Sequence, residues 1–307
     1  MLNKIINKTK TLPLISHLID FLKWIKLPLL KGLSLYDLLK LYSDEIIQGD
    51  LSYRASSIAF SFFMALFPFM LFILNLIPFI PIQGFQDDFM QFVAEGVPPK
   101  TYEAIATIIN DILNNSHSGL LSTGFLLSIF LSANGINAVL SGFENSKNIT
   151  IKRAYFQQYL VALLMSLGLS VLLIVTISAI VFFEVLIQKT IIQDVLSDRI
   201  SLIVIGRYVF VIAMILMATS VLFKFGIKRD KNRAFISVGS VFTTILIVLT
   251  SYGFGIWVLK FSKYNELYGS IGTLLIMMFY IWINCMILLL GFELNAIINK
   301  HNNDRIQ

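Results

Sequence analysis

The sequence predicts an all-α membrane protein: a bundle of six transmembrane helices, preceded by amphipathic helices at the membrane surface. Three observations predict this fold class: an apolar composition, six long apolar segments and an uneven placement of positive charge. Of the 307 residues, 57% are hydrophobic and 14% are charged. A soluble domain carries about 45–50% apolar and about 25% charged residues, so a water-facing globule cannot hide this much apolar surface.

Six segments have the length and composition of membrane spans. A spanning helix needs about 20 apolar residues, because each residue rises about 1.5 Å through a core about 30 Å thick. Helices are favoured because backbone groups in lipid must be paired within the segment. The predicted spans cover residues 57–80, 119–140, 158–186, 201–225, 235–259 and 269–290, and the last helix can continue past Asn295. They divide the chain into an interfacial segment (1–53), a membrane domain (54–298) and a tail (299–307).

The positive charges predict which way the bundle faces. Eighteen of the 24 Lys and Arg residues lie in the two terminal segments and in the connections after the second and fourth spans. Five lie on the opposite side, and Arg207 lies within the fourth span. By the positive-inside rule, both termini are cytoplasmic. The same arrangement accounts for the net charge of +6 without a nucleic-acid partner.

Two regions outside the spans have amphipathic patterns. Within the first 50 residues, apolar side chains share one helical face beside Lys23 and Lys26, which predicts helices lying on the inner leaflet. The acidic loop over residues 81–118 is interrupted by Pro98 and Pro99, with apolar residues at helical spacing on both sides. It predicts two short helices over the outer face of the bundle, and an irregular acidic loop is the alternative.

Polar side chains inside apolar spans are costly in lipid, so they mark candidate residues of a cavity or of contacts between helices. The candidates are Arg54, Asn75, Asn134, Asn137, Glu184, Arg207, Asn284 and Glu293. Structural alternatives stay open for them: an interfacial anchor for Arg54, hydrogen bonds between helices for the asparagines, and snorkelling to the interface for Glu184.

Two of these residues invite specific pairings. Arg207 has three open interpretations: it snorkels outward, it pairs with Glu184, or it lines a polar cavity and attracts an anion. Glu293 is expected to pair with Arg54 or Arg153, because all three belong at one membrane face. Pro68 is expected to kink the first span, and an interrupted helix is the alternative.

The sequence offers no set of catalytic residues. His17, His117 and His301 lie on different segments, and Cys285 is the single cysteine. The phosphate-binding, zinc-protease and serine-hydrolase motifs are absent. We therefore expect no catalytic, cofactor-binding or metal-binding residues, and a protein that is not an enzyme.

Three stretches resemble one family of bacterial inner-membrane proteins. The first covers residues 54–68, which end in Phe67-Pro68. The second joins residues 132–136 to 143–145. The third joins residues 264–272 to 290–295, which open and close the last predicted helix. Together they resemble the YihY/BrkB family over roughly residues 40–300. The resemblance implies six spans, cytoplasmic termini and the bacterial cytoplasmic (inner) membrane.

The resemblance implies little about mechanism. The family has carried a ribonuclease BN label, which this sequence does not support, since no cluster of carboxylates or histidines could hold catalytic metals. One hypothesis is a transporter or flippase that moves an envelope lipid or an anionic solute through a polar intramembrane cavity, with membrane lipids as partners. The alternative is a non-transporting membrane scaffold for envelope assembly or resistance.

Overall fold

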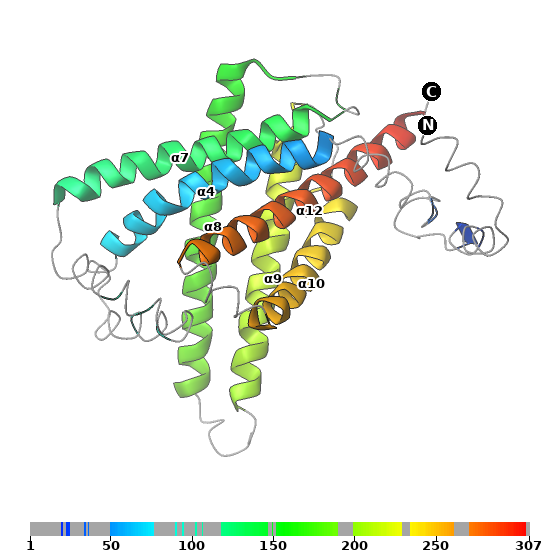
Figure 1. Ribbon diagram of the computed structural model, residues 1–307. Helices are drawn as coiled ribbons and strands as arrows, with labels where there is room; N and C mark the ends of the chain where they lie inside the picture. Colours follow the sequence, from blue (N-terminus) through cyan, green and yellow to red (C-terminus); the bar gives the residue numbers. More distant parts are fainter. Residues whose placement is uncertain are drawn as a thin grey trace.

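The computed structural model describes residues 50–76, 118–146, 149, 152–189, 199–228, 234–260 and 270–304, with isolated positions elsewhere. Within these ranges the chain forms long α-helices (Figure 1). They are α4 (Asp50–Leu76), α7 (Ser118–Glu144), α8 (Tyr155–Lys189), α9 (Arg199–Phe225), α10 (Val238–Lys260) and α12 (Ser270–Asp304). The predicted helices before residue 50 and over residues 81–118 lie outside the described residues.

The helices coincide with the apolar segments, and they are long. Five of the described helices contain a stretch long and apolar enough to cross a membrane. These stretches are Leu126–Glu144, Tyr155–Phe183, Val204–Phe225, Val238–Val258 and Leu274–Ile298. Helix α8 has 35 residues and is therefore about 52 Å long. Large apolar side chains are exposed along α8, as expected for a helix whose solvent is lipid.

The helix bounds lie within a few residues of the predicted spans except at two places, the start of α4 and the end of α12. Helix α4 begins at Asp50 rather than at residue 57, so Arg54 lies inside a helix. It continues without interruption through Pro68 to Leu76. Helix α12 continues past the expected end of the span to Asp304, so most of the predicted tail is helical.

The described helices form a closed ring. Each helix packs against its neighbour in sequence, and α12 packs against α4 to close the circle. Hydrogen bonds between side chains join several neighbours. Thr219 of α9 lies 3.5 Å from Thr244 of α10, Ser251 of α10 lies 2.6 Å from Tyr280 of α12, and the indole of Trp282 donates to Ser56 of α4 at 3.1 Å.

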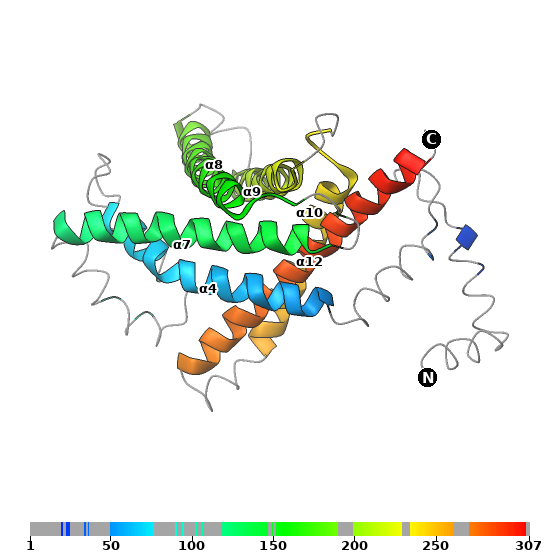
Figure 2. The ribbon, with the colours of Figure 1, turned by 90° about the horizontal axis from the view of Figure 1, so that it is seen from above.

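The two ends of the ring differ. At one end of the ring α4, α8 and α10 begin and α7 and α9 end. The second half of α12 also lies at this end, which we call the closed end. Its fully buried side chains include Leu51, Ile58, Phe143, Leu289 and Phe292. Toward the opposite, open end the helices diverge: the side-by-side pair α4 and α7 points away from α8 and α9 (Figures 1 and 2). The core of the described bundle is therefore concentrated at the closed end.

Candidate functional site

Three phenylalanine rings fill the middle of the closed end. Phe143 of α7 stacks on Phe292 of α12, with ring centroids 4.1 Å apart and planes inclined by 6°. Phe223 of α9 meets both rings edge-on, at 5.7 and 6.1 Å. Since α7, α9 and α12 belong to different sides of the ring of helices, the three aromatic side chains span its interior.

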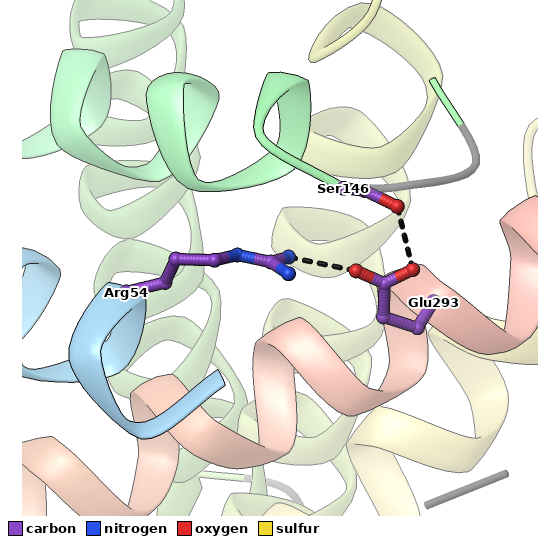
Figure 3. Close-up of polar contacts among 3 residues, drawn as sticks. All are labelled: Arg54, Ser146 and Glu293. Atoms are coloured by element: carbon purple, nitrogen blue, oxygen red, sulfur yellow. Dashed lines mark hydrogen bonds and ion pairs between the residues drawn. The ribbon is translucent and has the colours of Figure 1, made fainter. Parts of the chain in front are cut away.

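A buried ion pair lies on the same turn of α12. Nη2 of Arg54 on α4 is 2.8 Å from Oε1 of Glu293 on α12, and the two side chains are 8% and 0% exposed. The hydroxyl of Ser146, just after α7, donates to Oε2 of Glu293 at 2.6 Å. Figure 3 shows both groups converging on the carboxylate. We call these three residues together with Phe143, Phe223 and Phe292 the plug.

The ion pair gives the plug its electrostatic character. Removing two charges from water is expensive, and good geometry with further hydrogen bonds is needed to compensate. Both oxygens of Glu293 are engaged, but Nε of Arg54 has no hydrogen-bond partner among the described residues. Arg54, Glu293 and Ser146 therefore join α4, α12 and the end of α7, and Nε of Arg54 is left over within the described part of the chain.

A close crossing of α10 and α12 lies on the same stretch of α12 as Glu293. Gly239 of α10 lies against Gly291 of α12, and a Cβ at either glycine would collide with the facing backbone or with Thr243. Asn295 then accepts from the N–H of Gly239 at 2.8 Å and donates to the hydroxyl of Ser237 at 2.7 Å. The spacing Gly-x-Glu-x-Asn thus combines a close approach, an ion pair and a helix cap.

A second polar cluster joins α7 to α8 beside the plug. The buried carboxylate of Glu144 accepts from the N–H of Arg153 at 3.2 Å. The amide of Gln158, oriented with its nitrogen toward Glu144, donates to Oε2 at 3.1 Å and accepts from Ser141 at 2.8 Å. The pKa of Arg153 is lowered from its ordinary value, because the loss of water around the guanidinium outweighs the opposing effect of the charge of Glu144.

Arg153 also caps the neighbouring helix. Its guanidinium donates to the carbonyls of Phe225 and Gly226, both at 2.8 Å, where α9 ends. These carbonyls have no partner within the helix, so the contact satisfies them and adds a cation at the negative end of the helix dipole. Arg153 is therefore occupied at α9, and Glu293 has Arg54 as its partner.

The other candidate residues are distributed over the bundle. Asn134 and Asn137 are half-buried on α7, and Asn284 on α12 donates to its own helix at the carbonyl of Tyr280, at 2.8 Å. Arg207 is exposed on α9. Asn75 and Glu184 lie on α4 and α8 in stretches whose side chains are outside the described part. The structure thus brings together Arg54 and Glu293, and no other two of the eight candidates in its described side-chain contacts.

The sequence did not single out the remaining members of the plug. Ser146 and the three phenylalanines have residue types too common in a membrane protein to be noticed. The available signal was the resemblance, because Phe143 and Phe292 lie in two of the stretches that carry it, residues 143–145 and 290–295. Among the described residues, no group of three or more His, Cys, Asp or Glu side chains could hold a metal ion.

Comparison with known proteins places this arrangement in a family. Residues 43–307 match the family model described as virulence factor BrkB. The chain is 25% identical to YfkH of Bacillus subtilis, which is named as ribonuclease-like, over 80% of this chain and 90% of the relative. It is 25% identical to a UPF0761 membrane protein of Kangiella koreensis, over 80% of this chain and 59% of that longer relative.

A UPF0761 membrane protein of Coxiella burnetii is 23% identical, over 80% of this chain and 87% of the relative. No solved structure matches the chain. The family match covers the described helices and the plug together. The chain therefore belongs to the virulence factor BrkB family and is a helical membrane protein.

Proposed function

We propose that this protein moves a lipid with an anionic headgroup between the two leaflets of the bacterial inner membrane. One observation carries the proposal: the plug fills the middle of a ring of helices at one end, and the helices diverge toward the other. A ring that is sealed at a single end is the arrangement expected of a path with a gate. The plug is the gate, and the diverging helices are the entrance.

The chemistry of the helices supports a lipid as the cargo. Large apolar side chains are exposed on the open halves of α8, α9 and α10, such as Phe182, Val209 and Ile256. Acyl chains can move along such surfaces without exposing apolar area to water, while a charged headgroup needs polar contacts along its path. Arg207, exposed two turns into α9, supplies a positive charge for an anionic headgroup near the entrance.

The topology completes the proposal. Six crossings with both termini in the cytoplasm agree with the distribution of Lys and Arg, and they put the closed end at the cytoplasmic face. The lipid then enters from the outer side.

Reconstitution tests the proposal directly. The purified protein is placed in liposomes that contain a fluorescent analogue of phosphatidylglycerol, and a membrane-impermeant reductant bleaches the outer leaflet. Movement between leaflets predicts that more than half of the fluorescence is lost, whereas protein-free liposomes stop at about half. A fluorescent phosphatidylcholine and an encapsulated soluble anion serve as comparison cargoes.

Each outcome distinguishes a hypothesis. Faster movement of the anionic lipid than of phosphatidylcholine supports the proposal, and release of the soluble anion alone would replace the lipid by a solute. If neither moves, with wild-type protein or with variants that weaken the plug, the proposal is wrong. The scaffold hypothesis is then favoured, and its own test is co-purification of a stable partner that survives Arg207→Ala.

A further inference from the structure

A groove lined by apolar side chains runs between α8 and α9. Its α8 wall extends from Val161 to Val175, and its α9 wall consists of Met217, Val221 and Phe225. The groove has a volume of about 600 Å³ and is about 21 Å long along α8. That length covers one leaflet of a hydrocarbon core about 30 Å thick. None of the eight candidate residues lines it.

The middle of the groove is open space. A Cβ added at Gly168 would meet no atom within 4 Å. Leu164 and Val171 on either side are exposed, while Met165 and Leu169 turn toward the core. The groove therefore has a packed floor and room for one extended hydrocarbon chain in van der Waals contact.

Cations gather where the groove ends at Phe225. Arg153 is fixed there by its bonds to the carbonyls of Phe225 and Gly226. Lys152 precedes Arg153 in the sequence and is exposed, with one hydrogen bond from its Nζ to Oδ1 of Asn145 at 3.1 Å. Lys228 follows Gly226 by two residues and is also exposed, and Lys224 lies over the ring of Phe235 at 5.6 Å. The nearby carboxylate, Glu144, is buried and bonded to the backbone of Arg153. The end of the groove is thus positively charged.

We propose that this groove binds one acyl chain of an anionic phospholipid, with the phosphate against Lys152 and Lys228. The apolar walls select a hydrocarbon chain, and the cations select the charge of the headgroup. The lipid belongs to the leaflet at the closed end. The site is separate from the inside of the ring and exists whether or not the protein moves lipid.

Two glycines allow a matched test of the groove. Gly168→Leu fills the groove, while Gly253→Leu adds the same side chain to α10 at a position that is equally open and lies outside the groove. Lys152→Gln with Lys228→Gln removes two exposed charges, and the glutamine amide at position 152 keeps a donor for Asn145. Native mass spectrometry of the full chain, released from nanodiscs of equal phosphatidylglycerol and phosphatidylcholine, counts the retained lipids.

The expected result is a retained phosphatidylglycerol on the wild type and on Gly253→Leu, and its loss by about tenfold on Gly168→Leu. The double lysine variant should retain both lipids equally. Equal retention of the two lipids by the wild type overturns the proposal. So does an equal loss on both leucine variants, because it shows that the retained lipid does not occupy the groove. Lipid movement between leaflets is a different readout, so failure of the proposed function leaves this result unaffected.

Discussion

At the scale of the residue, the plug depends on one carboxylate. Glu293 is fully buried, and its two oxygens are bonded to Arg54 on one side and Ser146 on the other. The sequence could predict that Glu293 needs a cationic partner, because a lone carboxylate is costly in a membrane. It could not choose between Arg54 and Arg153, since that choice depends on Arg153 being used to cap α9.

Breaking the ion pair from one side should destabilise the protein more than replacing both charges. Glu293→Gln leaves the guanidinium of Arg54 buried without its partner, and we expect a loss of about 3–5 kcal/mol in the free energy of unfolding. Arg54→Met should cost a similar amount.

The double variant Arg54→Met with Glu293→Gln should cost less than the sum of the two, because neither charge is left alone. Unfolding of the purified protein in mixed micelles provides the three values. Additive losses would mean that the two side chains are not coupled, in contradiction to the structure.

At the scale of the element, close helix crossings hold the plug in place. The sequence predicts the helices well, because twenty-residue apolar segments have few other solutions in lipid. It does not predict that α10 and α12 cross at Gly239 and Gly291, since any small residue in a span is a candidate for such a contact. Similarly, the early start of α4 at Asp50 is not visible, because polar residues at a membrane interface break the apolar pattern.

Gly291→Ala should weaken the crossing. The new Cβ would collide with the side chain of Thr243, and overpacking of this kind costs about 1–3 kcal/mol. Gly253→Ala on α10 is the matched control, because its Cβ meets nothing within 4 Å and alanine favours the helix. Thermal unfolding should therefore shift downward for the first variant and remain unchanged or rise for the second. An equal shift in both would show that no close crossing exists at Gly291.

Asn295 should stabilise the start of α10 from outside that helix. Asn295→Ala removes the acceptor for the N–H of Gly239, which costs about 1 kcal/mol in typical helix caps. Asn295→Asp keeps this acceptor, loses the donor to Ser237 and adds a negative charge, which the N-terminus of a helix favours. Hydrogen exchange of the first turn of α10 should accelerate for the alanine variant and less for the aspartate variant. Unchanged exchange in the alanine variant would remove Asn295 from the cap.

At the scale of the whole molecule, the protein is a ring with unlike ends. Hydropathy predicts the long apolar helices, which the structure confirms over the described residues, and the orientation that the charges indicate stays a prediction. They contain no information about which helices touch, so the ring and its plug could not be foreseen. The rings of Phe143, Phe223 and Phe292 come from three helices far apart in sequence, and they meet only in the packed bundle.

The charge distribution makes a prediction about orientation. If the closed end is cytoplasmic, a reporter fused after residue 307 should be active as a cytoplasmic fluorescent protein and inactive as a periplasmic phosphatase. Fusions within the connection between α8 and α9 should show the opposite pattern. Phosphatase activity at the C-terminus would mean that the closed end faces the periplasm, so that the lipid would enter from the cytoplasmic side.

The most direct test of the plug as a gate compares three variants in the same liposome assay. Phe143→Leu and Ser146→Ala weaken the plug with little loss of volume or charge, and Phe183→Leu alters a ring that contacts Phe210 between α8 and α9, outside the plug. We predict that both plug variants move the anionic lipid several-fold faster than the wild type, while Phe183→Leu moves it at the wild-type rate. Wild-type rates in folded plug variants, or an equal rise in all three, would contradict the account.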